Sequence, residues 1–174
     1  MAKGGYRWEL NGPLPIIHDH SRAKHDVLRA YLVNYLRILA QSPRSEGVRV
    51  TLVDGFAGGG QYRSPNGEII PGSPLILLDA LAEARALVAL DRAQRGFKGP
   101  YVIQARIHLV EENAQTFAFL HQLIQNLPSA NDAHTSIALH HGRFEPTLPA
   151  ILEDIRARQR GGRSVFVLDQ YGWS

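Results

Sequence analysis

The chain has 174 residues, 44% of them hydrophobic, which is enough for one globular domain with a sizeable core. Its 19 Lys and Arg residues against 16 Asp and Glu residues give a formal charge of +3, so net charge alone does not predict a polyanionic partner. The chain has no cysteine, which excludes disulfides and thiolate chemistry within it, and no apolar run approaches the roughly 20 residues of a membrane helix. These features predict a soluble, cytoplasmic protein without a membrane partner.

The first half of the chain predicts an irregular segment, a helix, a strand and a second helix. Residues 1–20 are rich in Gly, Pro and polar side chains, whereas 21–174 are predicted to form one α/β domain. Helical spacing predicts a helix from Ser21, as its N-cap, to about residue 40. The β-branched run 48–53 predicts an inner strand. Residues 61–72 predict a loop, and Ser73-Pro74 predicts the N-cap and first position of a helix.

The second half continues the alternation of strand and helix. Strands are predicted at 101–110, 135–140 and 164–168, and helices at 114–127 and 148–158. This order predicts a Rossmann-like, three-layer α/β/α fold of the class I methyltransferase type. Its parallel strands, numbered along the chain, would lie in the order 3-2-1-4, with ligands at their carboxyl ends. We expect C-terminal strands to be missing, and a missing segment or a second chain to cover the edge of the fourth strand.

A carboxylate followed by a glycine-rich loop stands directly after the first strand. The loop reads Asp54-Gly55-Phe56-Ala57-Gly58-Gly59-Gly60. Because glycines let the backbone turn sharply and approach a ligand closely, the loop predicts a cofactor site. Asp54 would support the amino-acid part of the cofactor, and the helix start at Ser73 would face its carboxylate. The loop residues expected at the cofactor are Gly55, Phe56, Ala57, Gly58 and Gly60. A tight turn without a ligand is the alternative.

Two further candidates follow the second and third strands. Glu111 or Glu112 is expected to accept hydrogen bonds from the ribose hydroxyls of an adenosine ligand, and strand alternation favours Glu111. Phe144 is expected against the face of an adenine. The alternatives are a solvent-exposed acidic pair at a helix start and a core phenylalanine.

Asp169 and Tyr171 follow the fourth strand, which should lie beside the first strand at the topological switch point. Asp169 would hold an exocyclic amine and Tyr171 would stack on its ring, although a helix cap or turn is the alternative. The sequence does not assign a role to Lys24 and His25. His18, His20 and His25 lack the spacing and cysteine partners of a zinc site, so no metal is predicted.

Together these segments resemble the three-Cys-motif partner protein family (TcmP), a group of methyltransferase-like proteins. The resemblance covers most of the chain and implies a methyltransferase-like fold with S-adenosylmethionine as cofactor. The family usually has proline after the final aspartate, where this chain has Gln170. The glycine loop is also similar to that of cytosine C5 methyltransferases, whose mechanism requires a cysteine that this chain lacks. The resemblance rests on residues 24–32, 53–60, 72–75 and 169–172.

The sequence therefore predicts in-line transfer of a methyl group from S-adenosylmethionine to a heteroatom, an exocyclic amine of a nucleic acid or nucleotide. The basic segments 92–98 and 156–163 favour nucleic acid, although charged helix ends explain them equally well. One alternative is a catalytically silent module that binds the cofactor or a nucleotide. Another is an NAD-dependent oxidoreductase, but the loop lacks the Gly-x-Gly-x-x-Gly spacing.

Overall fold

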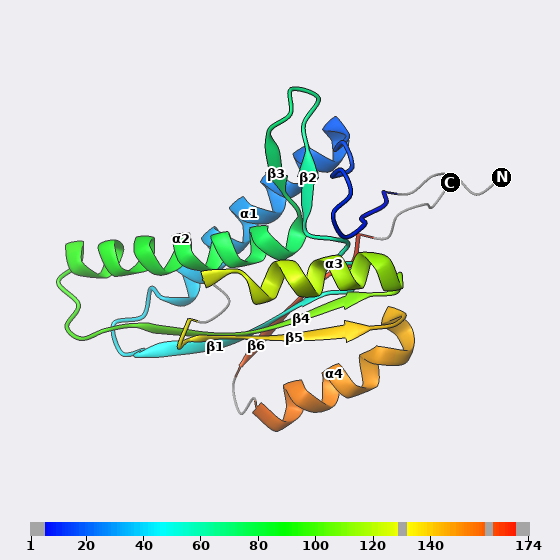
Figure 1. Cartoon of the computed structure of the whole chain (residues 1–174). Helices are drawn as coiled ribbons and strands as arrows, with labels where there is room; N and C mark the ends of the chain where they lie inside the picture. Colours follow the sequence, from blue (N-terminus) through cyan, green and yellow to red (C-terminus); the bar gives the residue numbers. More distant parts are fainter. Residues whose placement is uncertain (1–5, 129–131, 159–161, 170–174) are drawn as a thin grey trace.

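Four parallel strands form the central sheet of the fold. The structure, a computed structural model, describes residues 6–128, 132–158 and 162–169. In it, the sheet order is β5-β4-β1-β6 (Figure 1). The strands are β1 (Gly47–Asp54), β4 (Val102–Glu111), β5 (Thr135–His141) and β6 (Arg163–Val167). Taken as the four predicted strands, they run third, second, first, fourth. The predicted Rossmann-like α/β fold class is confirmed.

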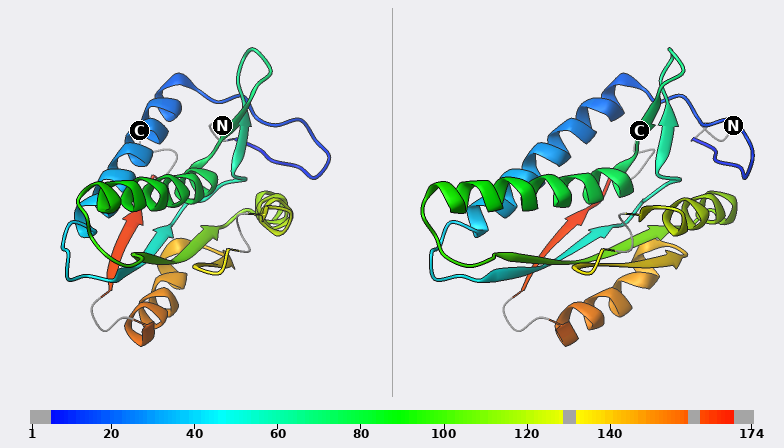
Figure 2. Two further views of the ribbon diagram at one scale, coloured as in Figure 1. Left: turned by 90° about the vertical axis from the view of Figure 1, so that its left-hand side faces the viewer. Right: turned by 60° about the vertical axis from the view of Figure 1, so that its left-hand side comes forward.

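Helices cover both faces of this sheet and make the fold three-layered. Three of them lie on one face and the fourth lies on the other, as the views of Figures 1 and 2 show. Those on the first face are α1 (Asp19–Leu39), α2 (Ser73–Gln94) and α3 (Ala114–Gln125), and that on the second is α4 (Phe144–Arg158). Within the described residues, no helix is both long and apolar enough to cross a membrane.

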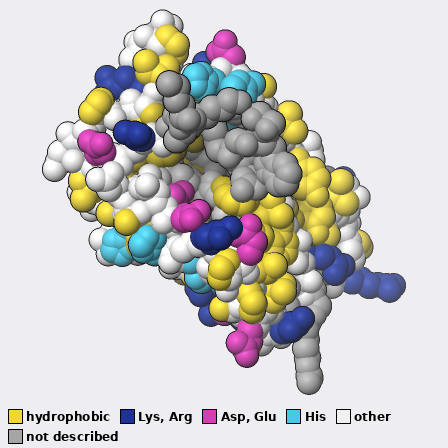
Figure 3. All heavy atoms as spheres, turned by 90° about the vertical axis from the view of Figure 1, so that its right-hand side faces the viewer, with side chains coloured by type: hydrophobic (Ala, Val, Ile, Leu, Met, Phe, Trp, Pro, Cys, Tyr) yellow, Lys and Arg dark blue, Asp and Glu magenta, His cyan; other side chains and the backbone are white. Residues whose placement is uncertain are grey.

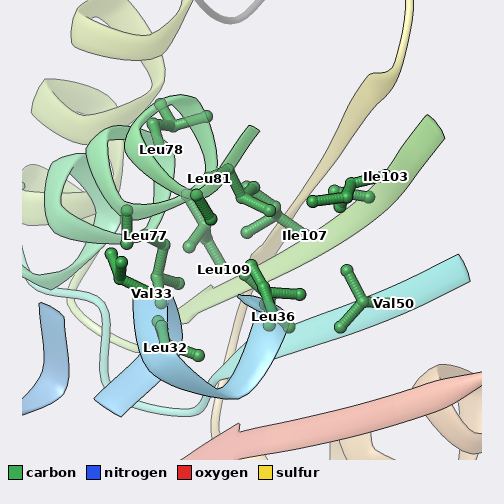
Figure 4. Packing of buried hydrophobic residues seen from close by; sticks show 14 of the residues in the cluster. Leu32, Val33, Leu36, Val50, Leu77, Leu78, Leu81, Ile103, Ile107 and Leu109 are labelled. Atoms are coloured by element: carbon green, nitrogen blue, oxygen red, sulfur yellow. The ribbon is translucent and has the colours of Figure 1, made fainter. Parts of the chain in front are cut away.

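The main core lies where α1 and α2 pack on β1 and β4. Leu32 and Leu36 of α1 meet Leu77 and Leu81 of α2, and all four side chains are fully or almost fully buried (Figure 4). Leu52 lies in the same cluster from the sheet. A smaller cluster under α4 contains Val53, Val110, Phe144 and Ile151. The second half of β1 is buried on both faces and contains Val50, Leu52 and Val53, whereas Arg49, nearer its start, is exposed.

Several element boundaries differ from those predicted. Helix α1 begins at Asp19, before Ser21, and α2 has Gly72 as its N-cap, so the predicted capping role of Ser73 is wrong. Helix α4 begins at Phe144 instead of residue 148. Pro146 is tolerated because it lies in the first turn, where backbone amides have no partner within the helix.

The predicted loop 61–72 contains a small hairpin of β2 (Gln61–Arg63) and β3 (Ile69–Pro71). The N-terminal segment runs alongside it, because the Ile17 amide donates to the Arg63 carbonyl and the Arg63 amide donates to the Pro15 carbonyl, both at 2.9 Å. Trp8, Ile17 and Tyr62 form a third buried cluster there. The residues before α1 are irregular in the described range, as predicted, yet they are packed.

Candidate functional site

A cavity of about 480 Å³ opens at the carboxyl ends of the strands, where ligands bind in folds of this kind. Figure 3 looks onto this end of the molecule, where acidic side chains gather beside a hollow. The volume falls within the range of small-molecule sites. The walls come from the glycine loop, the end of β4, the starts of α3 and α4, the N-terminal segment and Asp169.

The glycine loop is anchored to both strands that flank β1. The Gly55 amide donates to the Val167 carbonyl at 3.0 Å, and the Ala57 amide donates to the Val110 carbonyl at 2.9 Å. The chain then turns at Gly58, whose φ of 60° lies in the left-handed region that favours glycine. The loop is therefore held in place by hydrogen bonds to the strands on either side of β1.

Glu111 joins the end of β4 to this loop. Its Oε2 accepts the Gly58 amide at 3.0 Å, and its Oε1 accepts the Asn113 amide at 2.7 Å. Burial raises the pKa of Glu111, while these backbone amides lower it. A carboxylate has about four acceptor positions, so further positions remain for a ligand. Glu112 also lines the cavity but is exposed, with Oε1 3.9 Å from Arg143 Nε.

Asp54 lies beneath the loop instead of lining the cavity. Its side chain is buried, and Oδ1 accepts the Phe56 amide at 3.1 Å. Oδ2 is buried and makes no hydrogen bond within the described part of the chain. Burial raises the pKa of Asp54 to about 6, against the opposing effect of the Ser73 side chain and the Phe56 amide. In this structure Asp54 therefore shapes the loop.

The predicted cofactor residues divide into two groups. The cavity is lined by Gly55, Phe56, Gly58, Glu111 and Phe144. The predicted residues outside its lining are Asp54, Ala57, Gly60 and Ser73. Phe144 also belongs to the core under α4. The sequence had left open whether Phe144 is a core residue or faces the ligand site, and in the structure it lies in the core and also lines the cavity. Contact of these residues with a cofactor stays a prediction.

Asp169 lines the cavity and forms an ion pair with α1. Its Oδ1 lies 2.7 Å from Lys24 Nζ. The adjacent His25 has a buried Nδ1 without a hydrogen-bond partner among the described residues, and its ring lies 6.0 Å from that of Tyr62. Burial lowers the pKa of His25. Tyr171, the other predicted catalytic residue, lies outside the described residues.

One wall of the cavity was not predicted from the sequence, and it is formed by Tyr6, Arg7, Trp8 and Glu9. Trp8 is buried and donates from Nε1 to the Gln61 carbonyl at 2.6 Å. Its ring lies on the glycine loop so closely that a Cβ at Gly59 would be 2.3 Å from it. The only signal in the sequence was two large aromatic residues within an otherwise polar segment.

Carboxylates dominate the charged groups of the cavity. Its lining contains five carboxylates and two guanidinium groups, from Glu9, Glu111, Glu112, Glu145, Asp169, Arg7 and Arg143. Arg143 lies 4.0 Å or less from oxygens of both Glu112 and Glu145. Because charge complementarity guides recognition, this lining favours a ligand that carries positive charge over one that carries phosphates.

Arg92 belongs to the basic segment 92–98, which had favoured nucleic acid as a partner, but its side chain stabilises the fold. Arg92 is buried; its Nη1 donates to the Ala40 and Ser42 carbonyls at 3.0 Å, and its Nη2 donates to the Ser45 carbonyl at 3.1 Å. The guanidinium therefore holds the turn between α1 and β1 and does not face solvent.

Comparisons with known proteins assign no family to the chain, since no protein-family model matches it and no curated protein is significantly similar to it. The resemblance to the TcmP family therefore stays a prediction.

Proposed function

We propose that the protein is an S-adenosylmethionine-dependent methyltransferase whose cofactor binds in the cavity at the carboxyl ends of the strands. The observation that carries the proposal is the hydrogen bond between the Gly58 amide and Glu111. This bond places two features on the same wall of the cavity. One is a glycine backbone that a ligand can approach closely, and the other is a carboxylate that can accept hydrogen bonds from ribose hydroxyls.

The residues of the cavity suit this cofactor chemically. Glu111 has acceptor positions left for ribose hydroxyls, and Phe56 and Phe144, with ring centroids 6.0 Å apart, offer aromatic surface for an adenine. The carboxylates of the lining suit a ligand that carries a sulfonium and an ammonium group. When bound, the cofactor supplies an electrophilic methyl group on positively charged sulfur.

Asp169 is the residue that we assign to the methyl acceptor. Its carboxylate can accept a hydrogen bond from an exocyclic amine and so orient the lone pair toward the methyl group. An amine at Oδ1 would replace Lys24, which occupies that oxygen at 2.7 Å. We keep the exocyclic amine of a nucleic acid or nucleotide as the acceptor, with its base and not its phosphates facing the carboxylates of the cavity and Tyr171 as the residue that stacks on the base.

One alternative function fits the site less well, and another uses the same residues as the proposed one. NAD carries two phosphates, which the carboxylates around the cavity disfavour. A silent module that binds S-adenosylmethionine without transferring its methyl group would use the same residues. Binding alone does not separate that module from an enzyme.

A transfer assay tests the proposal directly. S-adenosylmethionine with a labelled methyl group is incubated with the protein and a panel of DNA, RNA, nucleotides and proteins. We expect one acceptor class to be labelled, and Asp169→Asn to lower the transfer rate while cofactor affinity is retained. Asp79→Asn, an exposed aspartate of α2, is the matched control and should keep full activity.

Three outcomes of the assay would contradict the proposal or the role that it gives to Asp169. Cofactor binding without label in any acceptor would identify the silent module, and absence of cofactor binding would reject the site. Equal loss of transfer in Asp169→Asn and Asp79→Asn would remove Asp169 from the mechanism.

A further inference from the structure

A second recess, of about 330 Å³, lies toward the amino ends of β1, β4 and β5, and it shares no lining residue with the cavity at the carboxyl ends. The side chains that the argument uses are Arg49, Thr51, Gln104, Arg106, Ser136 and Arg158. Arg106 and Arg158 both contact Asp154 of α4, which places the recess beside that helix.

The sheet face in this recess is polar. Thr51 pairs with Arg106, which pairs in turn with Ser136, and Arg49 pairs with Gln104. Paired residues of parallel strands point to the same face, so these side chains form two adjacent polar rows. Buried faces of parallel sheets are usually apolar. The composition at this end is therefore suited to a polar ligand and not to an apolar cover.

Farther along the strands the same face packs against α4. Val53, two residues after Thr51, belongs to the core under α4, and so do Val110 and Ile151. The polar residues of this part of the face, His108 and His140, contact each other, and His108 also lies 3.0 Å from Asp154 Oδ2. These two histidines are satisfied by protein groups and do not line the recess.

Asp154 orients two of the three arginines. Its Oδ2 lies 3.2 Å from Arg106 Nε, and its Oδ1 lies 2.7 Å from Arg158 Nε. Neither bond uses the terminal Nη groups, which can donate to another acceptor. Arg49 is exposed and provides a third guanidinium, while none of the described residues that line the recess carries a carboxylate.

We propose that this recess binds a phosphate group, either of a free nucleotide or of a nucleic-acid backbone. Guanidinium groups match phosphate oxygens with paired hydrogen bonds, and the hydroxyl of Ser136 is a donor of a second kind. Three guanidinium groups exceed the single charge of Asp154, so the recess has the opposite sign to the acidic cavity. The proposal does not depend on methyl transfer.

Calorimetric titration of the full chain at low salt tests the proposal, with inorganic pyrophosphate, adenosine monophosphate and a short single-stranded oligonucleotide as probes. We expect pyrophosphate to bind, and Arg49→Gln to weaken its binding by about tenfold, because a charge-assisted donor is lost. Arg29→Gln removes the same charge from α1, where Arg29 pairs with Glu83, and should leave the affinity unchanged. Comparison of the affinities for adenosine monophosphate and for the oligonucleotide shows whether the recess prefers the phosphate of a free nucleotide or that of a nucleic-acid backbone.

A second measurement on the unaltered protein avoids any effect of substitution on folding. Pyrophosphate should protect Arg49 from phenylglyoxal more strongly than it protects Arg29, as measured by peptide mass spectrometry. The proposal is overturned if pyrophosphate does not bind, if both substitutions weaken binding equally, or if the two arginines are protected alike.

Discussion

His108 of β4 is buried, and its protonation links pH to the stability of the fold. Its Nε2 lies 3.0 Å from Asp154 Oδ2, and its Nδ1 lies 2.9 Å from His140 Nε2. Only 2% of the side chain is exposed. The pKa of His108 is lowered from 6.5 to about 4, chiefly by burial and then by the charges of Arg106 and His140, against the opposing effect of Asp154. The folded protein therefore keeps this imidazole neutral where an unfolded chain would protonate it.

This difference predicts a loss of stability in mild acid. Between pH 6.5 and about 4 the unfolded chain binds the proton and the folded chain does not, so the free energy of unfolding falls as pH falls. The shift corresponds to a maximum of about 3 kcal/mol, since one pKa unit is about 1.4 kcal/mol. Asp54 acts in the opposite direction, because its raised pKa of about 6 favours proton uptake by the folded state. The contribution of His108 is therefore measured as the difference in pH dependence of unfolding free energy between wild type and a variant that lacks this histidine.

Urea denaturation from about pH 7 to about pH 4 measures this difference. His108→Gln keeps an amide donor for Asp154 but does not titrate, so we expect wild type to lose about 2 to 3 kcal/mol more than this variant across the range. His121→Gln, at an exposed histidine of α3, should follow wild type. Parallel curves for wild type and His108→Gln would refute the reasoning.

Two further substitutions test packing beside the glycine loop and the turn before β1. Gly59→Ala should destabilise the fold by about 1 to 3 kcal/mol, because its Cβ would lie 2.3 Å from the Trp8 ring. Urea denaturation measures the stability, and Trp8 fluorescence is measured in a Trp173→Phe background. Unchanged stability together with unchanged Trp8 fluorescence would contradict this prediction. Arg92→Met should cost about 3 kcal/mol in urea denaturation, because three backbone carbonyls of the turn before β1 lose their donor, and a loss below about 1 kcal/mol would contradict the structural role of Arg92.

The sequence predicted those features that depend on local pattern. The β-branched run 48–53 predicted an inner strand, which is β1, and the sequence also placed Glu111 at the end of the second predicted strand, where β4 ends. Both follow from the period of a strand and from the parallel topology. Neither needed knowledge of distant contacts.

Features that depend on distant contacts were not predictable. Strands β2 and β3 have three residues each, and the N-terminal segment pairs with Arg63 beside them, which no local pattern indicates. The position of Trp8 on Gly59 joins residues far apart in the chain. The ion pair of Lys24 with Asp169 likewise required the fold, because it connects the start of α1 to the residues after β6.

The central claim is that the cavity beside the glycine loop binds S-adenosylmethionine through Glu111. Calorimetric titration with S-adenosylmethionine, S-adenosylhomocysteine and NAD tests it on wild type, Glu111→Ala and the neighbouring control Glu112→Ala. We predict that the first two ligands bind and NAD does not, and that Glu111→Ala weakens binding by about tenfold or more while Glu112→Ala has a much smaller effect. Binding of NAD alone, or equal affinities in the two variants, would contradict the claim.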